Sequence, residues 1–185
     1  MSFIGKLIRP LRAGDKKLAI EDPAFAGTPG LAVSSDAFAD GAPMPAPYVG
    51  ADGVFPPLRW SGAPANTQSF ALIVQDIDVP LPAPLVHAVA YGIAREAESL
   101  SAGAIPRAGS DEPVPSNLVI GRGVAGNAYA PPTPIPGHGP HHYVFQVFAL
   151  DAPLDFVESP GESDLLKAMH GHVLACGAVT GTHEA

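Results

Sequence analysis

The side chains best suited to chemistry in this sequence stand at the ends of apolar segments. Asp76 and Asp78 are two residues apart just after the apolar run 69–75, so in extended chain both carboxylates point the same way. His141 and Tyr143 have the same spacing where another apolar run begins, and His87 opens a third. Imidazoles and a phenol can donate hydrogen bonds to an anion, while a carboxylate orients the rings and raises histidine pKa values from about 6.5. The pattern predicts one shared pocket for a small anionic group.

The sequence motifs give less support to a catalytic, nucleotide-binding or metal-binding function. The sequence has no G-x-S-x-G, no P-loop and no H-E-x-x-H, and the G-x-G-x-x-G match at 121–126 is followed by Pro131 and Pro132 instead of a helix. We therefore expect no enzyme activity and no cofactor. A metal-dependent hydrolase remains an alternative, although no spacing matches an established metal motif. Its candidate ligands would be Asp76, Asp78, His87, His138, His141 and His142.

Three short apolar runs and one later amphipathic segment indicate the elements that position these residues. Residues 69–75, 86–93 and 143–150 read as strands, and turn-rich stretches separate them. The spacing of apolar residues after Ser163 predicts a helix that ends at Gly177 and carries Cys176 on its apolar side. Because strands and helices do not alternate, the order favours a mainly β fold over a parallel sheet.

Composition and charge set the class of protein. The 185 residues are 46% hydrophobic and 15% charged, which suits one folded domain. Residues 18–185 hold 5 basic and 17 acidic residues, a net charge of −12, so a nucleic-acid partner is excluded. A lone cysteine rules out an internal disulfide and fits a reducing cytoplasm, with the periplasm as an alternative. No run of 18 apolar residues predicts a transmembrane segment.

The first 17 residues form a basic amphipathic arm, distinct from a single domain at 18–185. Half of the chain's ten basic residues lie in this arm, at Lys6, Arg9, Arg12, Lys16 and Lys17. A helical wheel gathers its apolar residues on the opposite side, at Phe3, Ile4, Leu7, Ile8 and Leu11. Such a helix suits a membrane surface, but Pro10 would break it. We favour an arm that packs on the domain or on a second subunit.

Several motifs, in order along residues 18–183, carry a family resemblance. They are Pro57-Leu-Arg-Trp-Ser-Gly-Ala-Pro64, Ser69-Phe-Ala-Leu-Ile-Val-Gln-Asp-Ile-Asp-Val-Pro80, Val86-His87, and Pro132-Thr-Pro-Ile-Pro-Gly-His-Gly-Pro-His-His-Tyr143. With them the chain resembles the phosphatidylethanolamine-binding proteins, in particular their small bacterial and archaeal members, the Raf-kinase-inhibitor-like proteins. The resemblance implies an antiparallel β-sandwich with a few peripheral helices, one of them C-terminal, and a homodimer.

The resemblance also implies a pocket that takes phosphate, acetate-like anions or the phosphorylethanolamine head group, with no metal. Carried over residue by residue, its ligand-binding positions are Asp76, Asp78, Pro80, His87, Pro132, Pro134, His141 and Tyr143. Such a module could act through protein partners, and an interaction or inhibitor protein with a vestigial pocket is a further alternative.

Four positions depart from the family pattern. Ala88 stands where Trp is usual, which should open one pocket wall, and Pro131 removes a backbone N–H from the pocket loop. His142 replaces an Arg, and His183 replaces a Tyr. These changes bear on ligand geometry more than on the fold.

Overall fold

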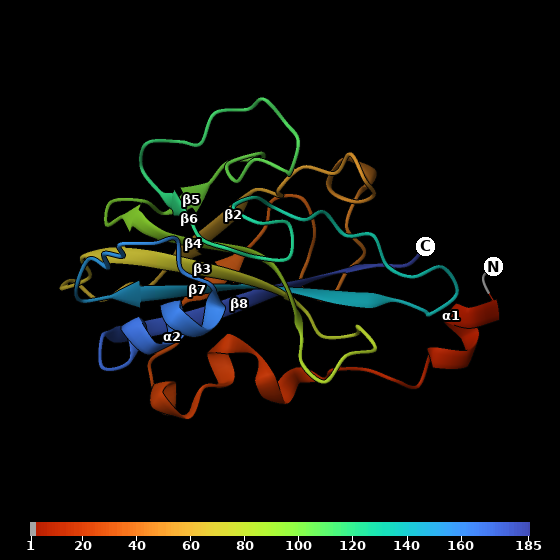
Figure 1. Ribbon diagram of the computed structural model, residues 1–185. Helices are drawn as coiled ribbons and strands as arrows, with labels where there is room; N and C mark the ends of the chain where they lie inside the picture. The colour runs from red at the N-terminus through yellow and green to blue at the C-terminus, as the bar shows by residue number, and fades with distance from the viewer. Residues whose placement is uncertain (1–2) are drawn as a thin grey trace.

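The three apolar segments form the centre of the larger of two antiparallel sheets. The computed structural model describes residues 3–185 (Figure 1). The larger sheet has the order β6-β4-β3-β7-β8, with β6 at Val119–Ile120, β4 at Leu85–Ala94, β3 at Ser69–Asp76, β7 at His141–Leu150 and β8 at Val173–His183. The smaller sheet has the order β1-β2-β5, at Ala32–Ser34, Leu58–Ser61 and Ser99–Leu100. The predicted β-sandwich is confirmed.

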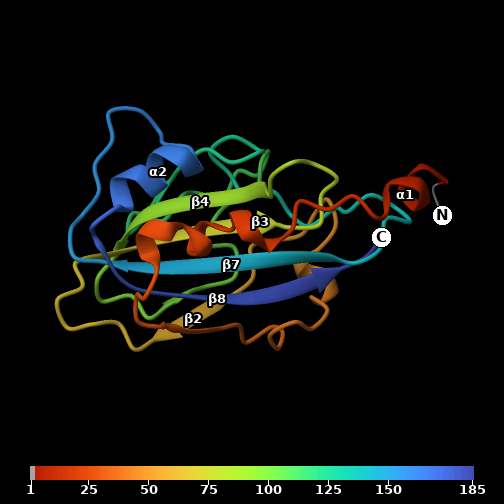
Figure 2. The ribbon, with the colours of Figure 1, turned by 90° about the horizontal axis from the view of Figure 1, so that it is seen from below.

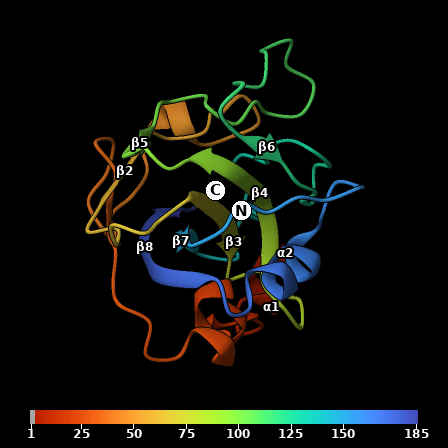
Figure 3. The same cartoon turned by 90° about the vertical axis from the view of Figure 1, so that its left-hand side faces the viewer.

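The side chains of β3 and β7 alternate between two apolar layers. Phe70 and Leu72 of β3 pack with Phe145 of β7 between the two sheets, where Trp60 of β2 joins them. The intervening residues, such as Ile73, face the opposite side of the large sheet. There α2 and the short 3-10 turns of the N-terminal segment cover them (Figures 2 and 3). Each central strand is therefore buried on both faces, which explains why it reads as an apolar run.

Helices are few and short. The α-helices are α1 at Phe3–Ile8 and α2 at Glu162–Met169, and the 3-10 turns are η1 at Asp15–Lys17, η2 at Ala19–Glu21, η3 at Pro23–Phe25 and η4 at Ala46–Tyr48. Among residues 3–185, no helix is both long and apolar enough to cross a membrane.

The prediction of a helix from Ser163 to Gly177 is wrong over its second half. The N-cap is Gly161, α2 ends at Met169, and Gly171 follows with φ of 82°, in the left-handed region that glycine adopts most easily. The chain then enters β8, so the half-buried Cys176 lies on a strand and not on a helix. The buried positions of β8 alternate with a period of two, as a strand requires.

A bulge in β4 places one of the predicted site residues. Val74 pairs with Ala88 and Gln75 pairs with Val86, so β4 supplies one more residue than β3 at this point and His87 is the extra one. Bulges re-aim side chains and often lie beside functional sites. Here Ala88 faces the layer between the sheets, while His87 is directed to the end of that layer.

The N-terminal segment runs along the domain and ends in α1 beyond the sheet (Figure 2). The amides of Ala13 and Gly14 donate hydrogen bonds to the carbonyls of Val79 and Ile77, at 3.0 and 2.8 Å. The arm therefore packs on its own domain through main-chain contacts, and it does so beside the turn that follows β3.

Candidate anion-binding site

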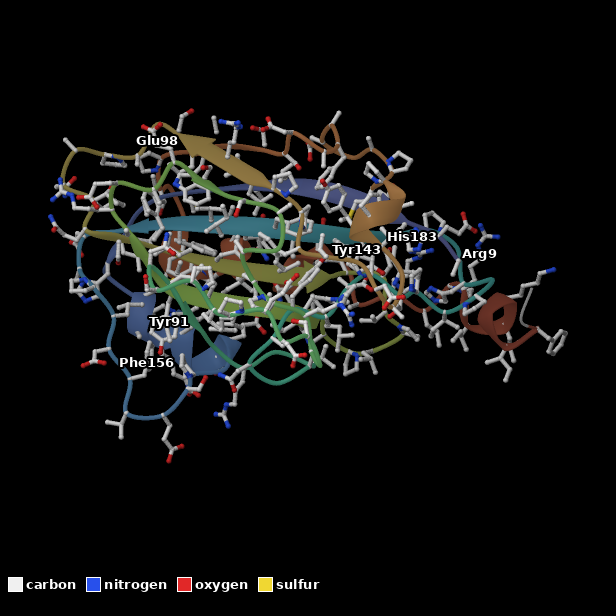
Figure 4. The ribbon with its side chains drawn as sticks, turned by 90° about the horizontal axis from the view of Figure 1, so that it is seen from above. Arg9, Tyr91, Glu98, Tyr143, Phe156 and His183 are labelled. Carbon is white, nitrogen blue, oxygen red and sulfur yellow. The ribbon has the colours of Figure 1, made fainter. Side chains whose placement is uncertain are left out.

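The ends of β3, β4 and β7 meet around a cavity of about 290 Å³. It is lined by Asp76, Val79, Pro80, Leu81, Leu85, His87, Thr133, Pro134, Ile135, His141 and Tyr143. Six of the eight predicted site residues are in this lining, and Asp78 and Pro132 are not. The cavity lies near the start of β7, at the end of the layer between the sheets where Tyr143 is found (Figure 4).

Asp76 is the central acceptor of the cavity. It is the last residue of β3 and pairs with Tyr143 on one side and Leu85 on the other. Its Oδ1 accepts a hydrogen bond from the amide of Asp78 at 2.8 Å, and its Oδ2 lies 2.7 Å from Nδ1 of His141. The buried carboxylate thus fixes both the turn after β3 and the plane of a pocket imidazole.

A chain of two imidazoles continues from Asp76 to the N-terminal arm. His141 Nε2 lies 2.8 Å from Nδ1 of the fully buried His138, whose Nε2 lies 3.1 and 3.2 Å from the carbonyls of Ile8 and Leu11. Nε2 of His138 must carry a proton, because it faces only acceptors. The chain therefore links the Asp76 carboxylate to the N-terminal arm through two imidazole rings.

His87 presents an unpartnered nitrogen to the cavity. Its Nδ1 lies 2.6 Å from the carbonyl of Ala130 and must donate to it, whereas its buried Nε2 has no partner within residues 3–185. Burial lowers the pKa of His87 and outweighs the opposite effect of Asp76. Asp76 acts on the pKa of His87 in the expected direction, but burial has the larger effect, so the ring is neutral at neutral pH, with a free lone pair on Nε2.

Tyr143 adds a second unpartnered polar atom. Its hydroxyl is buried and makes no hydrogen bond to any described residue, and its ring lies edge-on to His87 with the centroids 5.1 Å apart. Burial, assisted by the charge of Asp76, raises the pKa of Tyr143 far above its ordinary value. The hydroxyl therefore stays protonated and can donate to a ligand.

Asp78 is occupied elsewhere. Its Oδ2 accepts from the amide and Nδ1 of His142, at 2.6 and 2.7 Å, and its Oδ1 pairs with Arg12. Burial alone would raise the pKa of Asp78, but these hydrogen bonds outweigh it and lower the pKa. Asp78 thus holds the arm and the start of β7 together, and it reaches the cavity only through the turn it shares with Asp76.

Some of the predicted prolines and of the positions that depart from the family pattern line the cavity, and others do not. Pro80 and Pro134 line the cavity, whereas the carbonyl of Pro132 accepts from the amide of Gly50 at 2.8 Å and holds the η4 loop. Ala88 is fully buried between the sheets and is absent from the cavity lining, and its effect on a pocket wall stays a prediction. His183 pairs with His141 across β7 and β8 (Figure 4).

Within residues 3–185, no three histidine, cysteine or acidic side chains converge as the ligands of one metal ion would. The nitrogens of His138 and His141 bind each other and the carboxylate of Asp76 instead. The hydrolase alternative therefore has no ligand set in this part of the chain.

The fold and the pocket together define a class of protein, and comparison with known sequences agrees. The family model described as phosphatidylethanolamine-binding protein matches residues 34–184, so the chain belongs to this family. The family resemblance inferred from the motifs is thereby confirmed.

Similar proteins occur in Pyrococcus and in Chlamydia. A UPF0098 protein of Pyrococcus abyssi is 38% identical over 144 residues, which cover 76% of this chain and 78% of that protein. A UPF0098 protein of Chlamydia muridarum is 34% identical over 160 residues, which cover 83% and 99%.

Solved structures agree with the sandwich. A putative phosphatidylethanolamine-binding protein homolog from Chlamydia trachomatis superposes with a TM-score of 0.73 at 32% identity, covering 84% of this chain and 98% of that one. YbcL of E. coli, described as a new member of the mammalian PEBP family, superposes with a TM-score of 0.72 at 28% identity, covering 84% of this chain and 98% of that one.

Proposed function

We propose that the cavity binds a small phosphate-type anion, either free or as the head group of a phospholipid. One observation carries the proposal: His87 Nε2 and the Tyr143 hydroxyl are buried beside the same cavity without a partner. A buried polar atom without a hydrogen bond destabilises a fold by about 1–3 kcal/mol, so two of them side by side suit a site that a ligand completes. The name of the family refers to a ligand of this kind.

The roles follow from the proton positions. Tyr143 donates its O–H to a phosphate oxygen, and the ring of His141 lies beside the bound anion in the cavity lining. His87 has only a lone pair to offer, so it either gains a proton when the anion binds or accepts the P–OH of a singly charged phosphate. Asp76 can accept from the ammonium group of an ethanolamine head group. The role proposed is binding without turnover, in line with the missing catalytic motifs.

Both routes for His87 require a proton, and this gives the test. Inorganic phosphate and phosphorylethanolamine should each bind more weakly at pH 8 than at pH 6, by about tenfold, because binding draws on a proton that becomes scarcer. Calorimetry or ³¹P NMR titration of the full chain measures this.

Two variants sharpen the assignment. His87→Ala should weaken phosphate binding by more than about tenfold and flatten its pH dependence. His172→Ala is the matched control, because His172 is exposed and pairs with Asp151 at the turn between α2 and β8. Unchanged affinity in His87→Ala would refute the assignment.

A further inference from the structure

Helix α1 is held against the cavity wall by its backbone. A Cβ at Gly5 would lie 2.1 Å from the carbonyl oxygen of Pro136, so only glycine allows this close approach. The ring of His138 then contacts the carbonyls of Ile8 and Leu11. The loop that holds α1 continues directly from Thr133, Pro134 and Ile135 in the cavity lining. The helix and the cavity are therefore joined through the loop 133–138.

Because α1 contacts the domain through Gly5, the apolar side chains of the arm are exposed to solvent. Phe3 is 81% exposed, Ile4 66%, Leu7 71% and Leu11 57%. Across residues 3–185 nine large apolar side chains are exposed, and four of them are these. Because α1 already contacts the domain through Gly5, its apolar face is not the face that fastens it. Something outside the domain must cover that face, since clustered exposed apolar residues mark contact sites.

The charged residues beside this apolar face indicate what kind of partner covers it. The exposed Lys6 and Arg9 lie in the same segment as the apolar face, within an arm that holds half of the chain's basic residues. Residues 18–185 carry −12, so the arm is the most basic part of the chain, and Lys6 and Arg9 of the arm line one hollow together with Glu184 and Ala185. Apolar side chains interleaved with cations suit the interface of a bilayer with anionic lipids. Four side chains fall short of the ~800 Å² that each partner contributes to a stable protein dimer.

The cavity opens at the same corner. Leu81, which is 49% exposed, and Ile135 belong to its lining. Tyr143 and His183 lie toward the α1 end, as Arg9 does, whereas Tyr91, Glu98 and Phe156 lie toward the other (Figure 4). A bilayer that covers α1 would therefore meet the cavity as well.

We propose that α1 and the adjoining cavity mouth form a docking surface for an anionic bilayer, so that the head groups bound are those of membrane lipids. The cavity part of this inference rests on the proposed function, whereas the docking part does not. Phe3, Ile4, Leu7 and Leu11 enter the interface, and Lys6 and Arg9 contact lipid phosphates. With α1 in the bilayer interface, the cavity lies at the level of the lipid head groups and binds one of them.

Vesicle flotation with the full chain tests the docking. Vesicles of phosphatidylglycerol and phosphatidylcholine should bind the protein, and pure phosphatidylcholine should bind it at least about tenfold more weakly. The pair Phe3→Gln and Leu7→Gln should lower binding to the anionic vesicles by about tenfold or more. Lys6→Gln with Arg9→Gln should lower it and reduce its salt dependence.

The matched control is Val157→Gln. Val157 is fully exposed and apolar but follows Phe156 toward the opposite end of the molecule (Figure 4), so its replacement should leave vesicle binding unchanged. The side chains of Phe3, Lys6, Leu7, Arg9 and Val157 are all exposed, and thermal unfolding checks that every variant is folded. Equal flotation of wild type and the Phe3/Leu7 variant overturns the docking.

Two further measurements separate the outcomes. If wild type fails to float and light scattering shows a dimer that the Phe3/Leu7 variant loses, the apolar face belongs to a second copy and the proposal is wrong. His87→Ala should lose phosphorylethanolamine binding and keep most of its flotation. Flotation of a wild type that binds neither phosphate nor phosphorylethanolamine would support docking while refuting the proposed function of the cavity.

Discussion

Two buried polar networks lie on opposite faces of the β3–β7 strand pair, and they differ in how completely they are bonded. On the face between the sheets, Asp76, His141, His87 and Tyr143 surround the cavity, and two of their polar atoms have no partner. On the other face, under α2, lies a network built around Gln75. These neighbouring residues of one strand, Gln75 and Asp76, therefore begin networks of different kinds.

The network under α2 is closed. Gln75 Oε1 accepts from the amide of Ala19 and from Nε2 of Gln146, each at 2.8 Å, and Gln146 Oε1 accepts from the amide of Ile20 at 2.8 Å. Gln75 Nε2 donates to Glu162 at 2.7 Å. No atom of either glutamine is unpartnered among the buried groups of residues 3–185. The closed network joins the N-terminal segment, strands β3 and β7, and helix α2. The open network instead lacks partners that a ligand can provide.

Breaking the closed network should have the largest effect on stability. Gln146→Leu leaves the half-buried Ile20 amide without its partner and removes one of the two hydrogen bonds that Gln75 Oε1 accepts, so we expect a loss of about 2–4 kcal/mol in urea unfolding. Gln68→Leu, at an exposed position, is the control and should change stability by less than ~0.5 kcal/mol. A loss as small as that of the control would mean that the network is not structural.

Removing a charge at the edge of the closed network should have an intermediate, pH-dependent effect. Burial raises the pKa of Glu162 to about 7. A carboxyl whose pKa is higher in the fold than in the unfolded chain stabilises the fold at low pH and loses that effect as the pH rises through about 7. Glu162→Gln keeps an acceptor for Gln75 but carries no charge, so it should stabilise the fold by about 1–2 kcal/mol at pH 8 relative to pH 5.

Urea unfolding of wild type and Glu162→Gln at the two pH values measures this difference. Asp164→Asn, in the exposed face of the same helix, is the control and should show no such pH dependence. A variant less stable than wild type at pH 8 would show that Glu162 is needed as a carboxylate.

Trimming the open network should have the smallest effect on stability and a clear effect on binding. Tyr143→Phe removes a hydroxyl that bonds to no described residue, so the free energy of unfolding should change by less than about 1 kcal/mol. Affinity for phosphate should fall about tenfold, because one donated hydrogen bond is lost. Tyr129→Phe is the matched control: its hydroxyl is equally buried and unpartnered, but the residue does not line the cavity. Equal affinities of the two variants would contradict the assignment of Tyr143.

The central strands could be predicted from the sequence because both of their faces are buried, which leaves long apolar runs. Strand β8 could not, because its buried positions include the small residues Gly177 and Gly181, and the spacing of Leu165, Met169 and Cys176 imitates a helix. Gly177 is small for a reason that lies elsewhere in the chain: a Cβ there would lie 2.1 Å from the carbonyl of Leu31.

The site was predictable where strand alternation holds. His141 and Tyr143 share a face because β7 includes both, but β3 ends at Asp76, so the alternation that linked Asp76 with Asp78 no longer applies beyond it. The sequence pattern indicates His138 only for the metal alternative and does not indicate Arg12 as a site residue. Their partners Leu11 and Asp78 lie 127 and 66 residues away, and no periodic pattern links them.

The way α1 is seated has a consequence for how this protein can diverge. A main-chain contact at Gly5 places no demand on the neighbouring residues that point outward. Substitutions at Phe3, Ile4, Lys6 and Leu7 can change the adhesive character of this corner while the pocket chemistry stays constant. Replacing Gly5 itself would shift the helix and disturb both at once. Because Gly5 alone makes this contact, the outward-facing residues of α1 and the residues of the cavity can change independently of each other during evolution.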